Sequence, residues 1–180
     1  MDLRLKGKKA LVTGGTKGIG RAIVAAFVGE GTHVAFCARN ATEVQQAQND
    51  LCGKGSTVLG TALDVGNKEA LEQWVRESAK ALGGLDIVVC NVSALAIPNS
   101  EENWQTSFNI DVMHTVRTCT TAIPYLGQSD SASIVNISSV SGREADFAGG
   151  PYGTAKSAII AYTAHLSLSL IHISEPTRRI

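Results

Sequence analysis

The chain alternates short apolar runs with longer stretches whose apolar residues recur every three or four positions. The short runs are Lys9–Thr13, His33–Cys37, Thr57–Thr61, Leu85–Cys90 and Ser133–Ile137. The longer stretches are Ile19–Glu30, Thr42–Cys52, Lys68–Leu82 and Trp104–Leu126, and a last helix is expected to begin near Tyr152. Parallel strands buried on both faces read as apolar runs, and they need crossover helices between them. The pattern therefore predicts one α/β domain: a doubly wound parallel sheet in the strand order 3-2-1-4-5, with helices on both faces.

Charge and composition narrow the possible partners. The 16 basic and 16 acidic residues cancel, so nothing favours a nucleic-acid partner. The first residues, Met1–Lys6, have no apolar leader region, and no apolar stretch is long enough to span a membrane. The 4 Cys and 4 His residues show no metal-ligand spacing, so we expect no metal site and reduced thiols. A cytoplasmic protein without nucleic-acid or membrane partners is expected.

A glycine-rich turn joins the first predicted strand to the first predicted helix. Its sequence is Gly14-Gly15-Thr16-Lys17-Gly18-Ile19-Gly20. Glycines allow a sharp turn and a close approach to a pyrophosphate, and the free amides of a helix N-terminus favour negative charge. Such a turn alone is weak evidence, because a plain tight turn has the same composition. Its place between an apolar strand and an amphipathic helix favours a dinucleotide site.

The residues after the second predicted strand address the choice of cofactor. An acidic residue there hydrogen-bonds the ribose 2′-hydroxyl of NAD, whereas an arginine accommodates the 2′-phosphate of NADP. This chain has Arg39, and the next carboxylate is Glu43. With Lys17 from the turn, Arg39 supplies positive charge for a 2′-phosphate. NADP(H) is therefore expected in preference to NAD(H), and the alternative is that both cations are only solvated surface residues.

A tyrosine and a lysine recur at helical spacing after the last predicted strand. Tyr152 and Lys156 are four residues apart, so they share one helix face. A neighbouring ammonium favours the phenolate form of a tyrosine, which helps it to exchange a proton. The spacing alone also occurs in surface pairs. The buried strand ending at Ser138-Ser139 brings hydroxyls to the sheet edge where ligands bind, and the thirteen-residue spacing to Tyr152 favours Ser139 over Ser138.

These segments together resemble the short-chain dehydrogenases/reductases, which have a Rossmann-type fold, and in particular the 3-oxoacyl-carrier-protein reductase-like and tropinone reductase-like members. The resemblance runs from about Leu5 to Leu168. It rests on TGGTKGIG, Asp64-Val65, CNVSA, NIDV, IVNISSVSG and YGTAK. One departure is Asn91-Val92-Ser93-Ala94, where the family commonly has Asn-Asn-Ala-Gly.

The resemblance implies a role for each matching residue. Ser139 would hold the substrate oxygen, Tyr152 would donate or accept the proton, and Lys156 would bind the nicotinamide ribose. Asn109 would support a water-linked proton path from the lysine. The cofactor-binding residues would be Gly14, Thr16, Lys17, Gly18, Ile19, Gly20, Arg39, Asp64, Val65, Asn91, Tyr152 and Lys156. The implied reaction is hydride transfer between NADP(H) and a small carbonyl or secondary alcohol, in a parent enzyme that forms a homodimer or homotetramer.

The end of the chain departs from the resemblance. Residues 1–168 are expected to form an incomplete NADP(H)-binding domain without the family's last strands and substrate loop. Residues 169–180 are interpreted as a non-native tail translated from sequencing-adapter DNA, and the alternative is a genuine divergent C-terminus. A marginally stable product with weak or no activity is expected. Two other hypotheses remain open at this point: a dinucleotide-binding protein without catalysis, and an inert fragment.

Overall fold

The computed structural model describes residues 2–53 and 55–174. Its five strands are β1 (Lys9–Thr13), β2 (His33–Ala38), β3 (Val58–Ala62), β4 (Ile87–Cys90) and β5 (Ser133–Asn136). They form one sheet in the order β3-β2-β1-β4-β5, and every neighbouring pair is parallel. The predicted doubly wound sheet and its strand order are confirmed.

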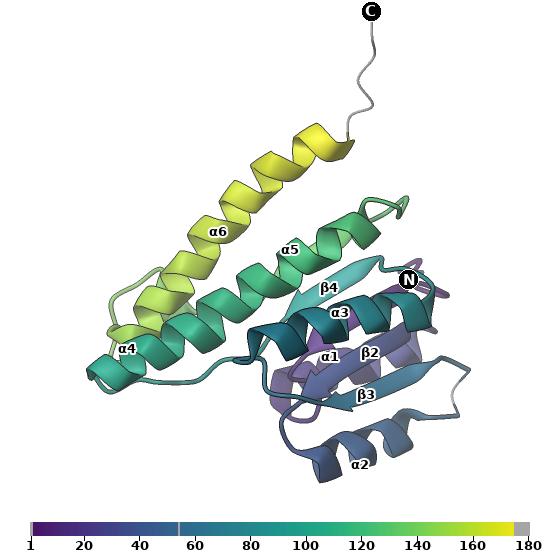
Figure 1. Ribbon diagram of the computed structural model, residues 1–180, viewed down its shortest axis with the longest axis horizontal. Helices are drawn as coiled ribbons and strands as arrows, with labels where there is room; N and C mark the ends of the chain where they lie inside the picture. Colours follow the sequence, from purple (N-terminus) through teal and green to yellow (C-terminus); the bar gives the residue numbers. More distant parts are fainter. Residues whose placement is uncertain (1, 54, 175–180) are drawn as a thin grey trace, which may run out of the picture.

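Helices cover both faces of this sheet (Figure 1). On one face lie α1 (Gly18–Gly29) and α2 (Ala41–Leu51), and on the other lie α3 (Lys68–Leu82), α5 (His114–Leu126) and α6 (Pro151–Ser174). The short α4 (Glu101–Ser107) precedes α5, and a 3-10 turn, η2 (Val140–Gly142), precedes α6. The helices α5 and α6 run side by side in Figure 1, and both reach the edge of the sheet at β5.

The predicted helix Trp104–Leu126 is divided by a π-helix. This segment, η1 (Phe108–Met113), connects α4 to α5, and the His114 N–H bonds to the Asn109 carbonyl five residues back. An α-helix closes its hydrogen bonds four residues back. One extra residue is therefore accommodated at η1, and such bulges often occur at functional sites.

The core consists of two layers, one on each face of the sheet. The first layer packs Leu71, Trp74 and Val75 of α3 against Leu11 and Val88 of the central strands. The second layer holds Phe36 of β2, which is fully buried, together with apolar residues of α1 and α2. Central strands covered on both faces carry apolar residues at successive positions, which explains the sequence pattern of β1, β2 and β4.

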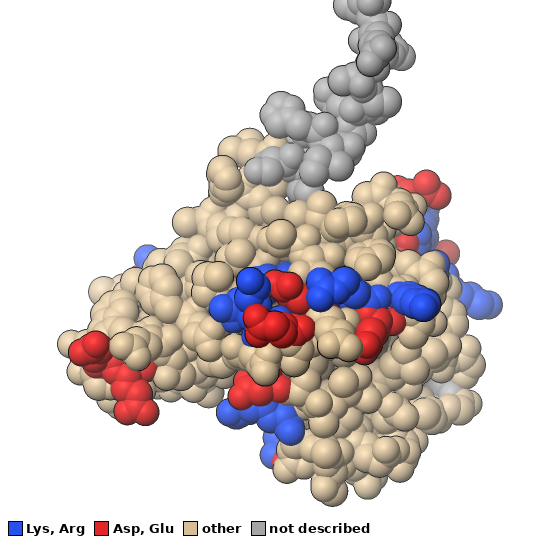
Figure 2. Space-filling model, viewed as in Figure 1, with Lys and Arg blue, Asp and Glu red and all other residues tan. Residues whose placement is uncertain are grey.

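The surface in Figure 2 shows basic and acidic side chains interspersed over the face that carries α3. This mixture agrees with the balanced composition. Within residues 2–53 and 55–174, no helix is long and apolar enough to cross a membrane. The backbone of α6 continues to Ser174, and residues 175–180 of the predicted tail lie outside the described residues.

Candidate active site at the carboxyl edge of the sheet

Five of the predicted site positions come together because each follows the carboxyl end of a parallel strand. The turn at Gly14 follows β1, Arg39 follows β2, Asp64 follows β3, Asn91 follows β4, and Ser139 follows β5. In a parallel sheet these ends share one edge, where ligands bind in open α/β folds. The fold therefore assembles at one edge residues that are up to 125 positions apart in the sequence.

The glycine-rich turn holds α1 against the end of β1. Gly14 has a φ of 75°, a left-handed conformation that favours glycine. A β-carbon on Gly20 would overlap the Gly14 carbonyl oxygen and would come within 2.6 Å of Asn91 Nδ2. Asn91 in turn donates its side-chain amide to the carbonyl of Thr13 at 3.2 Å. The first turn of α1 can approach the sheet this closely only because Gly20 has no side chain.

The N-terminus of α1 differs from those of α2, α3 and α4. These three helices are capped by the side chains of Asn40, Asn67 and Ser100, whereas Lys17 gives α1 no side-chain cap, and α1 has no acidic residue in its first turn. Uncapped amides and a positive helix end suit an anion. Ile19, in this first turn, is 63% exposed. Both features fit a bound pyrophosphate, and they fit the dinucleotide that the sequence predicts.

The two predicted cations occupy different electrostatic surroundings. Lys17 Nζ lies 2.8 Å from Glu43 Oε1, so part of its charge is compensated. Arg39 is exposed and makes no ion pair with any other residue that the structure describes. Beside these residues, an open hollow of about 320 Å³ lies between α1 and α2, and Thr16 and Glu43 are among its lining residues.

Tyr152 and Lys156 lie in the first turns of α6. Lys156 is only 2% exposed, and its Nζ lies 5.6 Å from the centre of the Tyr152 ring. The ammonium donates to the Ile137 carbonyl at 3.1 Å, just beyond β5. The predicted pair therefore shares one helix face at the sheet edge, and the lysine is buried rather than a solvated surface residue.

The two serines after β5 have different partners. Ser138 donates its hydroxyl to the backbone oxygen of Lys156 at 2.8 Å, so it fastens the strand end to α6. The Ser139 hydroxyl interacts with Ser141, whose own hydroxyl donates to Asp146 Oδ2 at 2.6 Å. Because Ser138 is engaged with the backbone, Ser139 is the better placed of the two to meet a substrate.

The side chain of Asn109 contacts residues other than Lys156. Its amide donates to the Gly66 carbonyl at 3.3 Å, and its side-chain oxygen accepts from Arg117 at 3.0 Å. Asp111 lies next to the lysine instead, with Oδ1 at 3.2 Å from Lys156 Nζ. Residues two apart on a helix point to different sides, so Asn109 and Asp111 serve different neighbours.

The side chains after β3 divide between surface and core. Asp64 is exposed, and its Oδ1 accepts from the Gly66 N–H at 2.9 Å. Val65 is 4% exposed and packs its side chain into the core. A contact from Val65 to an adenine would therefore come through its backbone. Asn109 of η1 holds this loop in place, because its side-chain amide donates to the Gly66 carbonyl.

A buried histidine that the sequence analysis did not single out links α5 to β1. His114 Nδ1 lies 2.6 Å from the Ile110 carbonyl and therefore carries the proton, so the Thr13 hydroxyl donates to Nε2 at 3.1 Å. Desolvation by burial lowers the pKa of His114 to about 4. The Thr13 hydroxyl also accepts from the Asn91 N–H at 2.9 Å, so the neutral imidazole fixes the ends of β1 and β4.

The sequence did contain a signal for Asp111. The buried residues of α5 include Thr115, Cys119, Ala122 and Leu126, at spacings of three and four. Continued backwards by four residues, this stripe reaches Asp111, which is fully buried. A carboxylate on a buried stripe requires a partner, and this identifies it as a candidate for the site.

Comparisons with known proteins agree with this geometry. Residues 8–172 match the family described as short chain dehydrogenase. The isoepoxydon dehydrogenase of Penicillium expansum is 40% identical over 169 residues, which cover 91% of this chain and 64% of that protein. The dehydrogenase/reductase SDR family member 4 of Homo sapiens is 32% identical over 171 residues, covering 92% and 62%. The chain thus spans less than two thirds of the length of these relatives.

Solved structures show the same architecture. The L-sorbose reductase of Gluconobacter frateurii, complexed with NADPH and L-sorbose, superposes with a TM-score of 0.89 at 28% identity, covering 96% of this chain and 68% of that one. A short chain dehydrogenase of Burkholderia cenocepacia in complex with NADP gives a TM-score of 0.86 at 28% identity, covering 93% and 70%. With a family match over residues 8–172, the chain belongs to the short-chain dehydrogenase/reductase family of oxidoreductases.

Proposed function

We propose that this chain catalyses reversible hydride transfer between NADP(H) and a small carbonyl or secondary alcohol, with Ser139, Tyr152 and Lys156 as its reacting site. The observation that carries the proposal is the buried position of Lys156, 5.6 Å from the Tyr152 ring at the ligand-binding edge of the sheet. A lysine is rarely buried without a partner or a function. The chain spans less than two thirds of the length of the curated relatives reported above. Its activity and its substrate class are therefore proposals.

The roles of the side chains follow from their chemistry. The cofactor, when bound, supplies the hydride that forms the new C–H bond of the alcohol. As the carbonyl π pair moves onto oxygen, the Tyr152 hydroxyl gives its proton to that oxygen and becomes a phenolate. Ser139 donates a hydrogen bond to the same oxygen, where charge develops. Lys156 lies beside the ring of Tyr152, and the reverse steps oxidise an alcohol.

NADP(H) is the proposed cofactor because of the charges around the turn. Arg39 follows β2, where an acidic residue would favour NAD(H), and it has no acidic partner among the described residues. Two relatives of known structure are bound to NADP or NADPH. A 2′-phosphate would bring two negative charges towards Arg39 and Lys17, and charge-assisted hydrogen bonds are the stronger kind.

Replacement of Tyr152 by Phe tests the proposal. The purified chain is incubated with NADPH and ethyl acetoacetate, a β-keto ester, and the loss of NADPH absorbance is followed. Tyr152→Phe should lower kcat/KM at least about a hundredfold, the usual scale of general acid catalysis, while the Kd for NADPH changes by less than about twofold. Tyr162→Phe, on the same helix, is the matched control and should retain turnover.

Other outcomes separate the rival functions. NADPH binding without turnover on ethyl acetoacetate or cyclohexanone would favour a dinucleotide-binding protein without catalysis. If NADPH and NADH both fail to raise the melting temperature, the chain is an inert fragment and the proposal is wrong.

We also propose self-association through the outer faces of η1 and α6. Among the residues that the structure describes, Ile160 of α6 is 37% exposed, and Phe108 and Met113, just before α5, are 44% and 37% exposed. Exposed apolar side chains grouped on neighbouring helices favour a protein interface. Light scattering coupled to size exclusion should give a dimer or tetramer, and Ile160→Lys should shift it towards the monomer.

A further inference from the structure

Asp111 connects three parts of the site from a fully buried position. Its Oδ1 lies 3.2 Å from the ammonium of Lys156 on α6, and its Oδ2 accepts from the Ala94 N–H at 3.0 Å, in the loop after β4. No hydrogen bond satisfies Oδ1, so the ionic contact with Lys156 is its interaction with the protein. A carboxylate that is buried away from solvent needs a positively charged partner of this kind to offset the cost of its desolvation.

Few other charges face this pair. On α6, Tyr152 lies beside Lys156. On α5, the charges of Asp111 and Lys156 both act on the imidazole of His114. Burial lowers the pKa of His114 to about 4, so it is neutral above that pH. The neighbouring segments η2 and β5 contain no titratable side chain, and Glu101 and Glu102 of α4 are exposed. The charge near Tyr152 is therefore set mainly by Lys156 and Asp111.

We propose that Asp111 is the counter-ion of Lys156 and that it weakens the attraction of the lysine for the Tyr152 phenolate, so that the site favours carbonyl reduction. Asp111 is thus a positioning residue that acts through the lysine. The consequence for turnover rests on the proposed function, whereas the charge relation among the three side chains can be measured without it.

The charge beside the Tyr152 ring determines which of its two forms, phenol or phenolate, is favoured. A lone buried ammonium attracts a phenolate and favours proton loss. A buried carboxylate paired with the ammonium offsets part of this attraction, so the phenolate is favoured less. Reduction of a carbonyl needs that phenol proton, while oxidation of an alcohol needs the phenolate as base. The ion pair therefore favours the reducing direction.

The ionisation of Tyr152 can be followed directly in the full chain without cofactor. The chain contains 3 Tyr residues, so labelling with tyrosine enriched in ¹³C at Cζ gives three NMR signals, and Tyr152→Phe assigns the one of interest. Asp111→Asn keeps the size of the side chain and removes its charge. We expect the midpoint of Tyr152 ionisation to fall by about one pH unit. The matched control is Asp130→Asn, which makes the same change at an exposed site and should leave the midpoint unchanged.

A second variant keeps the test decisive if the unpaired lysine prevents Asp111→Asn from folding. Asp111→Asn combined with Lys156→Gln removes both buried charges. If Asp111 offsets the attraction of Lys156 for the phenolate, this variant should ionise Tyr152 within about half a pH unit of the wild type. If Lys156 acts without its counter-ion, the midpoint should rise by more than a unit. That rise, or an unchanged midpoint in folded Asp111→Asn, would overturn the inference.

Turnover gives a separate measurement. With NADPH and ethyl acetoacetate in one direction, and NADP⁺ with ethyl 3-hydroxybutyrate in the other, Asp111→Asn should lower the pH at half-maximal kcat/KM for oxidation by about one unit. A wild-type chain without turnover would contradict the proposed function, while the NMR midpoints would still decide the role of Asp111.

Discussion

Gly142 lies directly against the backbone of Lys156: a β-carbon on Gly142 would come within 2.7 Å of the Lys156 carbonyl carbon. This contact joins η2, which follows Ser139, to the helix that carries Tyr152 and Lys156. A second contact joins the same two segments, because a β-carbon on Gly153 would lie 2.8 Å from the Ser141 carbonyl oxygen. The two glycines let η2 and α6 meet backbone to backbone.

Gly142→Ala should therefore separate Ser139 from Tyr152. The atoms that the new methyl group meets belong to backbone, which yields little, so we expect a loss of about 1–3 kcal/mol in the free energy of unfolding and a lower kcat. Urea denaturation and NADPH-linked turnover measure the two effects. Gly29→Ala is the matched control, since a β-carbon there meets no atom within 4 Å, and it should stabilise α1 slightly. Equal effects of both changes would contradict this account.

The stability of the fold should depend on pH through His114. Burial lowers the pKa of His114 to about 4, so the unfolded chain binds the proton more tightly than the folded chain. Stability is then fully present above about pH 6.5 and is lost as the pH falls towards 4. Between pH 7 and pH 5 we expect a loss of about 2 kcal/mol from this residue.

Urea denaturation of the wild type and of His114→Gln at these two pH values isolates that loss. The variant should be less stable at pH 7, because the bond to Thr13 changes, yet its stability should fall less on acidification. A variant that loses as much stability as the wild type between pH 7 and pH 5 would exclude His114 as the cause.

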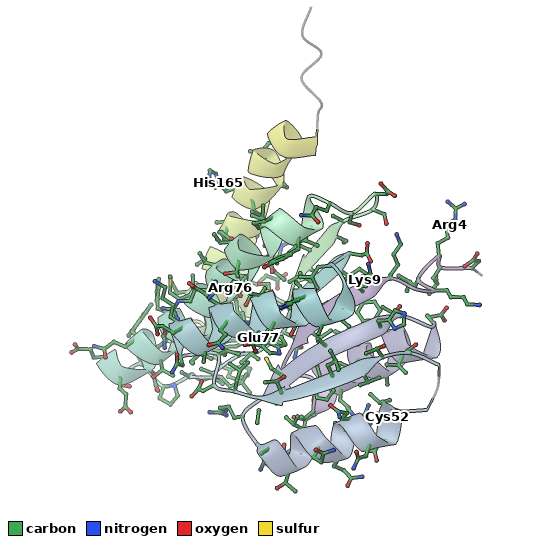
Figure 3. The ribbon with its side chains drawn as sticks, turned by 45° about the vertical axis from the view of Figure 1, so that its right-hand side comes forward. Arg4, Lys9, Cys52, Arg76, Glu77 and His165 are labelled. Carbon is green, nitrogen blue, oxygen red and sulfur yellow. The ribbon has the colours of Figure 1, made fainter. Side chains whose placement is uncertain are left out.

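Arg39 should determine the choice between the two nicotinamide dinucleotides. Arg39→Ser removes the cation that has no acidic partner among the described residues. We expect the Kd for NADPH to rise about tenfold, the equivalent of one charge-assisted hydrogen bond, and the Kd for NADH to stay the same. Arg76→Ser on the outer face of α3 (Figure 3) is the control and should alter neither constant. An equal rise for both cofactors would argue against a 2′-phosphate contact.

The four thiols should differ sharply in reactivity. Cys37, Cys90 and Cys119 are buried, and burial raises the pKa of Cys37 to about 12. Cys52 is exposed at the end of α2 (Figure 3). Since the thiolate is the reactive form, Ellman's reagent should modify one thiol quickly in the native chain and all four after denaturation. Cys52→Ser should abolish the fast phase, and a remaining fast phase would mean that a buried thiol is accessible.

The elements of the fold could be predicted because each carries a local signal. The apolar runs gave β1 to β5 within two residues at each end, and the periodic stretches gave α1, α2 and α3. The site positions Ser139, Tyr152 and Lys156 were also accessible to sequence reasoning, since a strand end and helical spacing place them at one edge. Their catalytic roles stay predictions until turnover is measured.

The π-helix and the side-chain contacts of Asn109 could not be predicted from the sequence. Helical periodicity across Trp104–Leu126 does not reveal a π-helix. The extra residue changes the backbone hydrogen bonds from four to five residues back and leaves no mark on the amino-acid composition. The contact between Gly142 and Lys156 was equally hidden, since it joins segments whose distance depends on the packed fold. Local patterns predict elements, whereas the approach of one element to another depends on side chains from both.

The π-helix η1 also sets a limit on the length of this segment. The buried stripe of α5 fixes Leu126 and Ala122 in the core, while Asp111 is fixed by Lys156, so both ends of the segment have a set rotation about the helix axis. Removing one residue would turn one end by about 100° relative to the other. A single-residue insertion or deletion in η1 would therefore disrupt either the core contacts of Ala122 and Leu126 or the ion pair between Asp111 and Lys156.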